Sequence, residues 1–317
     1  MFHLHKVARN LFDVNPRTPD FMTNSAKHLA GLGLLWALSL LIGWRPFLQT
    51  LVLASRDDQF TYILLIFPVS LALIFLEWPS LRTKLVFNVR VGSAILAAAL
   101  LIVCSSLLWA GSWSADMRLS IAMFALVLSW IGIFVSCIGS QGSRKVSFPL
   151  LFLFGSVPLP QSALDWVVAL LQQGSTTAAR VLFAVFGVPV TQDGVTLTIP
   201  GLTLQVAQEC SSIRSSSMLL VTTMVLAELL LRSPWRKLLV ILVAVPLSVA
   251  KNGLRVFSIA MLGTRVDRVF ITGAFHHQGG ILFFAIALIV IFVLLRILRK
   301  GEISQRTINV QPNAGHG

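Results

Sequence analysis

Three short polar blocks in this chain hold the residue types that a nucleophilic enzyme needs. The first is the run 208–214, in which Cys210 stands where a polar stretch ends and a long apolar stretch begins. A thiolate there would be stabilised by the start of the following helix and by Arg214, one helical turn further on. Ser211 is a possible supporting residue. The alternative is that Cys210 is a small interfacial residue and Arg214 extends to lipid headgroups.

The second block contains Asn252 and Arg255, which are spaced one turn apart inside an apolar stretch. Polar and ionisable side chains at that depth are costly in lipid and are candidates for function. A guanidinium remains charged and offers forked N–H groups, so Arg255 would suit a developing oxyanion. The alternative is that Lys251 and Arg255 pair with Glu209 or with headgroups.

The third block is the run 276–280, in which His276 and His277 precede two glycines and the last apolar stretch. One imidazole would serve as general acid and base near neutral pH. The alternative is a pair of solvated histidines that cap a helix. Each block is a weak signal alone, and their placement at three helix ends on one face favours a common site.

Composition defines the protein class. Hydrophobic residues make up 56% of the chain and charged residues only 12%, and apolar stretches of roughly 20 residues recur along it. We therefore predict an all-α polytopic membrane protein with about eight transmembrane helices. The predicted spans are 29–51, 62–76, 92–111, 119–138, 147–160, 213–231, 237–262 and 281–298, of which the fifth is short and rich in proline.

The net charge of +13 is concentrated in short loops between these stretches. That distribution follows the positive-inside rule and not the continuous basic surface of a nucleic-acid-binding protein, so nucleic acid is excluded as a partner. With eight spans, the basic loops face the cytoplasm and all three polar blocks face outward. Residues 1–28 form a cytoplasmic segment, 29–300 a single transmembrane domain, and 301–317 a disordered cytoplasmic tail. Arg265 and Arg268 lie in an outward loop and are candidates for ligand recognition.

The only sizeable extramembrane segment is an extracytoplasmic insert over 161–209, before the sixth span. Helical spacing of apolar residues predicts an interfacial helix over 164–186. Apolar and polar residues alternate on both sides of Pro200-Gly201, which predicts a β-hairpin over 190–206 that leads into Cys210. Cys104 and Cys137 sit inside apolar stretches, and the three cysteines give neither a disulfide framework nor a metal-ligand spacing. We expect no cofactor and no metal.

In this order, the three blocks resemble those of the exosortase/archaeosortase family of membrane transpeptidases. That family carries a Cys block of the form A-C-S-G-I-R, then N-x-x-R and H-x-x-x-G. The matching residues here are Cys210 to Arg214, Asn252 with Arg255, and His276 with Gly280. Two positions depart from the pattern, since Glu209 precedes the cysteine and Ser212 replaces the usual glycine. A carboxylate beside the thiol opposes thiolate formation unless a nearby cation neutralises its charge.

The resemblance implies a bacterial inner-membrane enzyme with its site facing the periplasm. Its substrates would be exported proteins that end in a short motif, often Pro-Glu-Pro, followed by a transmembrane helix and a basic tail. Its other partners would be membrane lipids and an exopolysaccharide or lipid acceptor. Cys210 would be the nucleophile, Arg255 the oxyanion donor and His276 the proton donor. The alternatives are a non-catalytic transporter or exopolysaccharide-export component, and an acyltransferase that uses His276 as its base.

Overall fold

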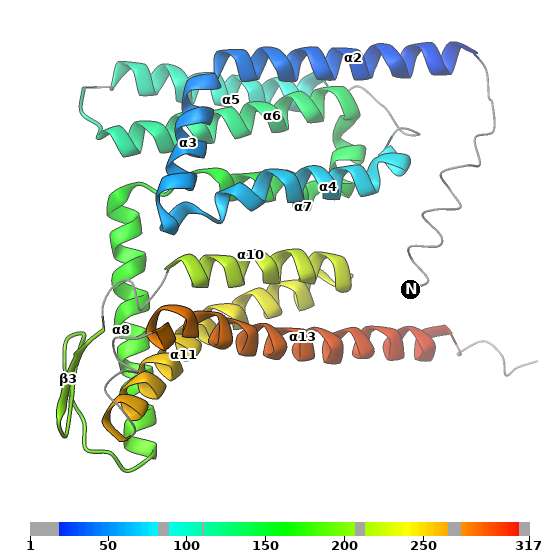
Figure 1. Cartoon of the computed structure of the whole chain (residues 1–317). Helices are drawn as coiled ribbons and strands as arrows, with labels where there is room; N and C mark the ends of the chain where they lie inside the picture. Colours follow the sequence, from blue (N-terminus) through cyan, green and yellow to red (C-terminus); the bar gives the residue numbers. More distant parts are fainter. Residues whose placement is uncertain (1–18, 82–88, 110, 207–212, 266–273, 311–317) are drawn as a thin grey trace, which may run out of the picture. The chain divides into compact units, whose positions relative to one another are not determined.

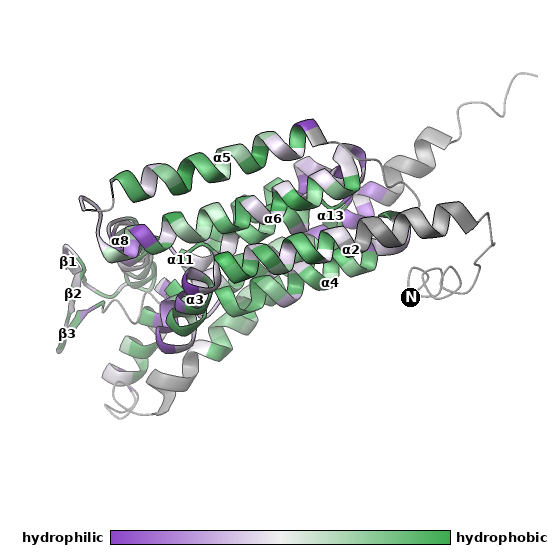
Figure 2. Ribbon diagram, turned by 90° about the horizontal axis from the view of Figure 1, so that it is seen from above, coloured by the Kyte–Doolittle hydropathy of each residue, from purple (hydrophilic) through white to green (hydrophobic). Residues whose placement is uncertain are grey.

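The computed structural model describes residues 19–81, 89–109, 111–206, 213–265 and 274–310 (Figure 1). The chain divides into two compact units, Met1–Gln161 and Ser162–Gly317. Within the described residues, six helices are long and apolar enough to cross a membrane, and the number reaches eight if each of two bent helix pairs is counted as one span. Figure 2 shows the apolar character along most of α5 (Val89–Leu108). An all-α polytopic membrane protein is thereby confirmed.

In the first unit, helices gather around the buried Trp130 of α6. Its ring lies 5.0 Å from that of Trp36 and 5.9 Å from that of Phe47, and its indole N–H donates to Ser39 Oγ at 3.1 Å. These contacts join two helices of the unit, 19–42 and 44–56, to the helix that contains Trp130. Besides α5, the elements are α2 (Pro19–Ile42), α3 (Trp44–Arg56), η1 (Asp58–Phe60), α4 (Ile63–Leu81), α6 (Ala115–Lys145), α7 (Ser147–Phe152) and η2 (Leu153–Ser156).

The first predicted span, 29–51, is not one straight helix. The chain bends by 73° between Gly31–Ile42 and Trp44–Arg56. Pro46 supplies the reason, because it has no N–H to bond the carbonyl of Ile42 and its ring clashes with that carbonyl in a continuous helix. The fifth predicted span is divided as well, into the short α7 and η2. Proline therefore determines where the first of these two apolar stretches breaks.

The second unit contains four long helices and a small sheet. They are α8 (Gln161–Val185), β1 (Thr191–Asp193), β2 (Thr196–Ile199), β3 (Leu202–Gln205), α10 (Ile213–Leu230), α11 (Pro234–Arg265) and α13 (Ala274–Val310). Figure 1 shows α8 running crosswise to the direction of α10 and α13, beside the ends at which those two helices begin. The predicted helix 164–186 is therefore present, and it runs in a different direction from the membrane-span candidates beside it.

The sheet is antiparallel in the order β1-β2-β3. Gly194 and Gly201 make its two turns with φ of 57° and 81°, a backbone region that glycine adopts without strain. The predicted hairpin around Pro200-Gly201 corresponds to β2 and β3, and β1 is a third strand that we did not predict. Leu197 and Ile199 bury one face of the sheet against Phe183 and Phe257, so the sheet is fixed on α8 and α11.

Helices α10 and α11 follow the predicted spans within a few residues, whereas α13 exceeds its predicted span at both ends. Helix α10 begins at Ile213 as predicted, whereas α13 begins at Ala274 and continues to Val310. Residues 301–310 are therefore helical and not the disordered tail expected from the sequence, while 311–317 lie outside the described residues. Leu219, Val240 and Ile291 pack in the common core of α10, α11 and α13.

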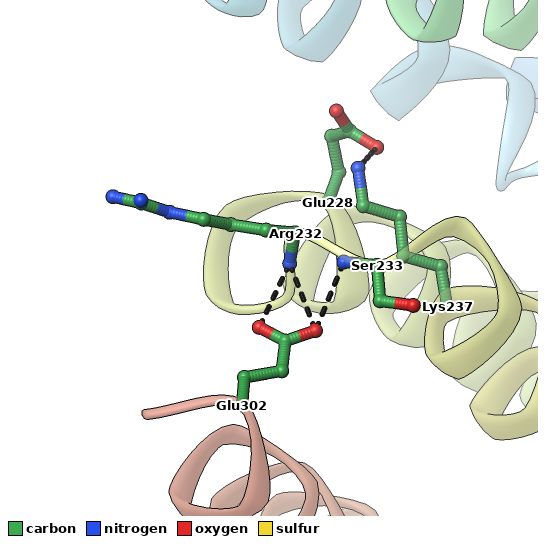
Figure 3. A network of polar contacts seen from close by, with 5 residues as sticks. All are labelled: Glu228, Arg232, Ser233, Lys237 and Glu302. Atoms are coloured by element: carbon green, nitrogen blue, oxygen red, sulfur yellow. Dashed lines mark hydrogen bonds and ion pairs between the residues drawn. The ribbon is translucent and has the colours of Figure 1, made fainter. Parts of the chain in front are cut away.

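A polar network joins the turn between α10 and α11 to the later part of α13 (Figure 3). The Glu302 carboxylate accepts from the backbone N–H groups of Ser233 at 2.9 Å and Arg232 at 3.1 Å. These donors precede α11 and have no partner within its helix, so an anion there is favourable. Arg236 Nη1 donates to the Leu298 carbonyl at 2.6 Å, and Lys237 pairs with Glu228 at 2.7 Å.

Helices α8 and α11 approach so closely at Gly253 that a larger residue cannot fit without movement. A Cβ there would lie 2.5 Å from Ala178 Cβ and 3.0 Å from the Ala179 nitrogen. We expect Gly253→Ala to destabilise the protein by about 1–3 kcal/mol through overpacking, measured as a lower melting temperature in detergent. Gly33→Ala is the matched control, since a Cβ at Gly33 meets nothing within 4 Å. Equal melting temperatures for the two variants would contradict this account of the helix contact.

Candidate active site

A buried ammonium group connects the start of α10 to α11. Lys251 is only 6% exposed, and its Nζ donates a hydrogen bond to the Ser215 hydroxyl. Ser215 lies in the first turn of α10, which begins at Ile213. This contact fixes the first turn of α10, and hence the end of the segment that contains Cys210, against the polar part of α11.

The two polar residues of the second sequence block, Asn252 and Arg255, come directly after Lys251 within α11. Asn252 is 1% exposed, and Arg255 is half-buried. Burial of an amide and a guanidinium within an apolar helix is costly unless protein groups surround them. The protein therefore encloses Asn252 and partly encloses Arg255.

The guanidinium of Arg255 lies against the start of α13. A Cβ added to Gly280 would be 3.8 Å from Arg255 Nη1 and 3.9 Å from Arg255 Cζ. The backbone of the third sequence block thus contacts the side chain of the second. Glycine leaves the space beside the guanidinium open, which a bulkier residue would fill.

The sheet and α8 hold the chain that enters the cysteine segment. The Gln172 side-chain amide on α8 donates to the backbone carbonyl of Val206, and the Val206 N–H donates to the Val195 carbonyl at 2.9 Å. Val206 is itself buried, in the same apolar cluster as Phe257 of α11. The last described residue before Cys210 is therefore fixed to α8, the sheet and α11 together.

The predicted site residues differ in how far the structure describes them. Cys210 and Ser211 lie outside the described residues, as does Arg268. His276 and His277 fall within α13 and not before it, and their side chains lie outside what is described. Arg214 is exposed in the first turn of α10, and Arg265 is exposed at the end of α11. Arg255 and Gly280 are the predicted residues that the structure brings together.

Sequence reasoning treated Lys251 as a partner for Glu209 or headgroups and did not single out Ser215. The signal available was spacing, since Lys251 and Arg255 lie one helical turn apart and share a face of α11. As to metal ligands, no group of three or more His, Cys, Asp or Glu residues is close enough to hold an ion among the described residues. The expectation that the protein uses no metal stays a prediction.

These features define a helical membrane protein in which polar residues at the start of α10, over 251–255 of α11 and at Gly280 of α13 lie close to one another. The family model described as transmembrane exosortase matches residues 53–293, most of the chain and all three sequence blocks. The chain belongs to the transmembrane exosortase family. No curated protein and no solved structure matches it.

Proposed function

We propose that this exosortase is a cysteine transpeptidase that cleaves the C-terminal sorting signals of exported proteins. The observation that carries the proposal is the contact between the Arg255 guanidinium and Gly280. It brings the second and third polar blocks together within one unit of the structure, and these are two of the three blocks that contain the proposed catalytic residues. A charged, half-buried donor beside an open glycine is suited to hold the oxygen of a reacting carbonyl.

In this mechanism the Cys210 thiolate attacks the carbonyl carbon of the scissile peptide bond. The carbonyl oxygen becomes an oxyanion, to which Arg255 donates hydrogen bonds. The tetrahedral intermediate collapses when the C–N bond breaks, and His276 protonates the departing amine. The resulting thioester is attacked by an amine or hydroxyl of the acceptor, or by water, which releases the product and restores the thiolate.

The covalent chain supports a shared location for these groups. Ile213 is three positions after Cys210, and an extended chain covers at most about 3.6 Å per residue, so Cys210 is tethered within about 11 Å of the start of α10. At that start, Ser215 is bound by Lys251, which is one turn from Arg255. Four further residues are proposed as supporting residues because each is close in sequence to one of the three proposed catalytic residues. They are Ser211 and Arg214 near Cys210, Asn252 near Arg255, and His277 next to His276.

The charge distribution supports an outward-facing site in the bacterial inner membrane. Arg232, Arg236 and Lys237 lie at the opposite end of α11 from Arg255, and clustered basic residues favour the cytoplasmic side. A substrate with its own transmembrane helix would approach from the lipid and present its motif to the site. The acceptor is an exopolysaccharide or lipid group.

The test is cleavage of a reporter. The wild-type protein is co-expressed with an exported reporter that ends in a Pro-Glu-Pro motif, a transmembrane helix and a basic tail, and with a copy whose motif is scrambled. We expect only the intact reporter to be shortened, with a new C-terminus within or beside the motif by mass spectrometry. The buried polar residues of α11 also suit a transporter or exopolysaccharide-export component. Persistence of both reporters at full length would favour that function instead.

A further inference from the structure

The strongest unassigned feature of the second unit is the burial of Lys251. A lysine ammonium is almost never fully buried without a paired charge, and here the side chain is 6% exposed. Its described hydrogen-bond partner is the neutral Ser215 hydroxyl. One hydroxyl satisfies one of the three N–H donors of an ammonium and none of its charge.

Among the described residues, the neighbouring charged side chains on the two helices are cations. Arg255 lies one turn further along α11, and Arg214 precedes Ser215 on α10. In the described part of the chain, no carboxylate lies within ion-pair distance of Lys251, and the Lys237–Glu228 pair is at the other end of α11. Two cations on one helix face repel each other unless an anion approaches.

We propose that Lys251 is a specificity-determining residue that binds a carboxylate of the substrate, in the part of the peptide next to the scissile bond. The inference rests on the proposed function. In this binding mode a side-chain carboxylate of the peptide approaches Lys251 at the contact between α10 and α11, whereas a lipid phosphate would meet the exposed Arg214 or Arg265 first. In this arrangement Lys251 binds the carboxylate, and Arg255 donates to the reacting carbonyl as proposed above.

This arrangement discriminates by charge. When a carboxylate reaches Lys251, a buried cation gains its counter-ion in a medium of low dielectric constant. When an uncharged amide of the same shape binds instead, the Lys251 ammonium stays buried without a counter-ion, which opposes binding and turnover. We therefore expect replacement of the substrate glutamate by glutamine to lower kcat/KM by about 100-fold in the wild-type enzyme.

The experiment is a double-mutant cycle. Wild type and Lys251→Met are each assayed with a Pro-Glu-Pro reporter and a Pro-Gln-Pro reporter. We expect Lys251→Met to slow cleavage of the glutamate reporter by about 100-fold, and to leave the two reporters within about threefold of each other. An equal slowing of both reporters would show that Lys251 only fixes α10 to α11 and would overturn the inference.

A matched pair at Ser215 keeps the test independent of the stability of Lys251→Met. Ser215→Asp places a carboxylate beside the ammonium and should abolish the preference for the glutamate reporter. Ser215→Asn is nearly the same size without the charge, so the preference should persist. Equal preferences in these two variants would contradict carboxylate binding by Lys251.

Glu209 is the alternative partner within the chain. If Glu209 is the counter-ion of Lys251, the wild-type enzyme should cleave the glutamate and glutamine reporters equally well. Adding Glu209→Gln to Lys251→Met should then restore the cleavage rate that Lys251→Met loses. That result would overturn the inference yet leave the transpeptidase intact. Failure of the wild type to shorten any reporter would instead refute the proposed function itself.

Discussion

Replacing Cys210 with alanine is expected to leave the sorting-signal reporter at full length, with a rate at least about 10³-fold below wild type. The thiolate is the group that would carry the acyl intermediate, and alanine can form no thioester. The measurement is the fraction of reporter shortened with time, together with a search for a hydroxylamine-sensitive enzyme–reporter adduct, which should be present in the wild type and absent from the variant.

Cys104 provides the matched control for that experiment. It is an exposed, free cysteine on α5 of the first unit, so Cys104→Ala should retain cleavage within about twofold, as surface substitutions usually do. Undiminished cleavage by Cys210→Ala would remove the cysteine mechanism. If His276→Ala were then inactive, the acyltransferase with a histidine base would become the better account.

Loss of the Arg255 guanidinium is expected to lower kcat by about 10²- to 10³-fold. The guanidinium lies beside the open space at Gly280, where it would donate to the oxyanion of the tetrahedral intermediate. Arg255→Met retains most of the length and apolar volume without the charge. Arg255→Lys keeps the charge but loses the planar fork, so we expect an intermediate rate.

The location of the kinetic defect decides the role of Arg255. An oxyanion donor acts in the transition state, so kcat and kcat/KM should fall together while KM changes little. A rise in KM with kcat unchanged would make Arg255 a substrate-binding residue and contradict the mechanism. Arg180→Met is the control, because Arg180 is an exposed cation on α8 of the same unit, and its kcat should stay within about threefold of wild type.

Much of the second unit could be predicted from local signals. The alternation over 190–206 and the Pro200-Gly201 turn predicted β2 and β3, because a strand with one buried face needs that period. The change from polar to apolar residues predicted the start of α10 at Ile213. The pairing of β1 was missed, since Thr191–Asp193 is a short polar strand whose stabilisation comes from its partner β2.

The contacts that define the site depend on which helix faces meet, and hydropathy does not specify that. Arg255 was predicted as an oxyanion donor from its type and depth, but its place beside Gly280 follows from how α11 and α13 pack. Likewise, the sequence shows Lys251 only as a basic residue within a polar block, and the hydrogen bond to Ser215 depends on how α10 packs against α11. The close approach of α11 to α8 at Gly253 is likewise a matter of which helix faces meet.

Helices α11 and α13 touch through an arginine near each end of their shared length, at Arg236 with Leu298 and at Arg255 with Gly280. At 1.5 Å per residue, the two arginines are about 28 Å apart along α11. The hydrocarbon region of an ordinary bilayer is about 30 Å thick. With Arg236 at one membrane boundary, Arg255 therefore lies close to the opposite boundary, within the predicted span that ends at 262. A markedly thicker membrane would place the Arg255 guanidinium deeper in the hydrocarbon, and tilting or local thinning would have to compensate.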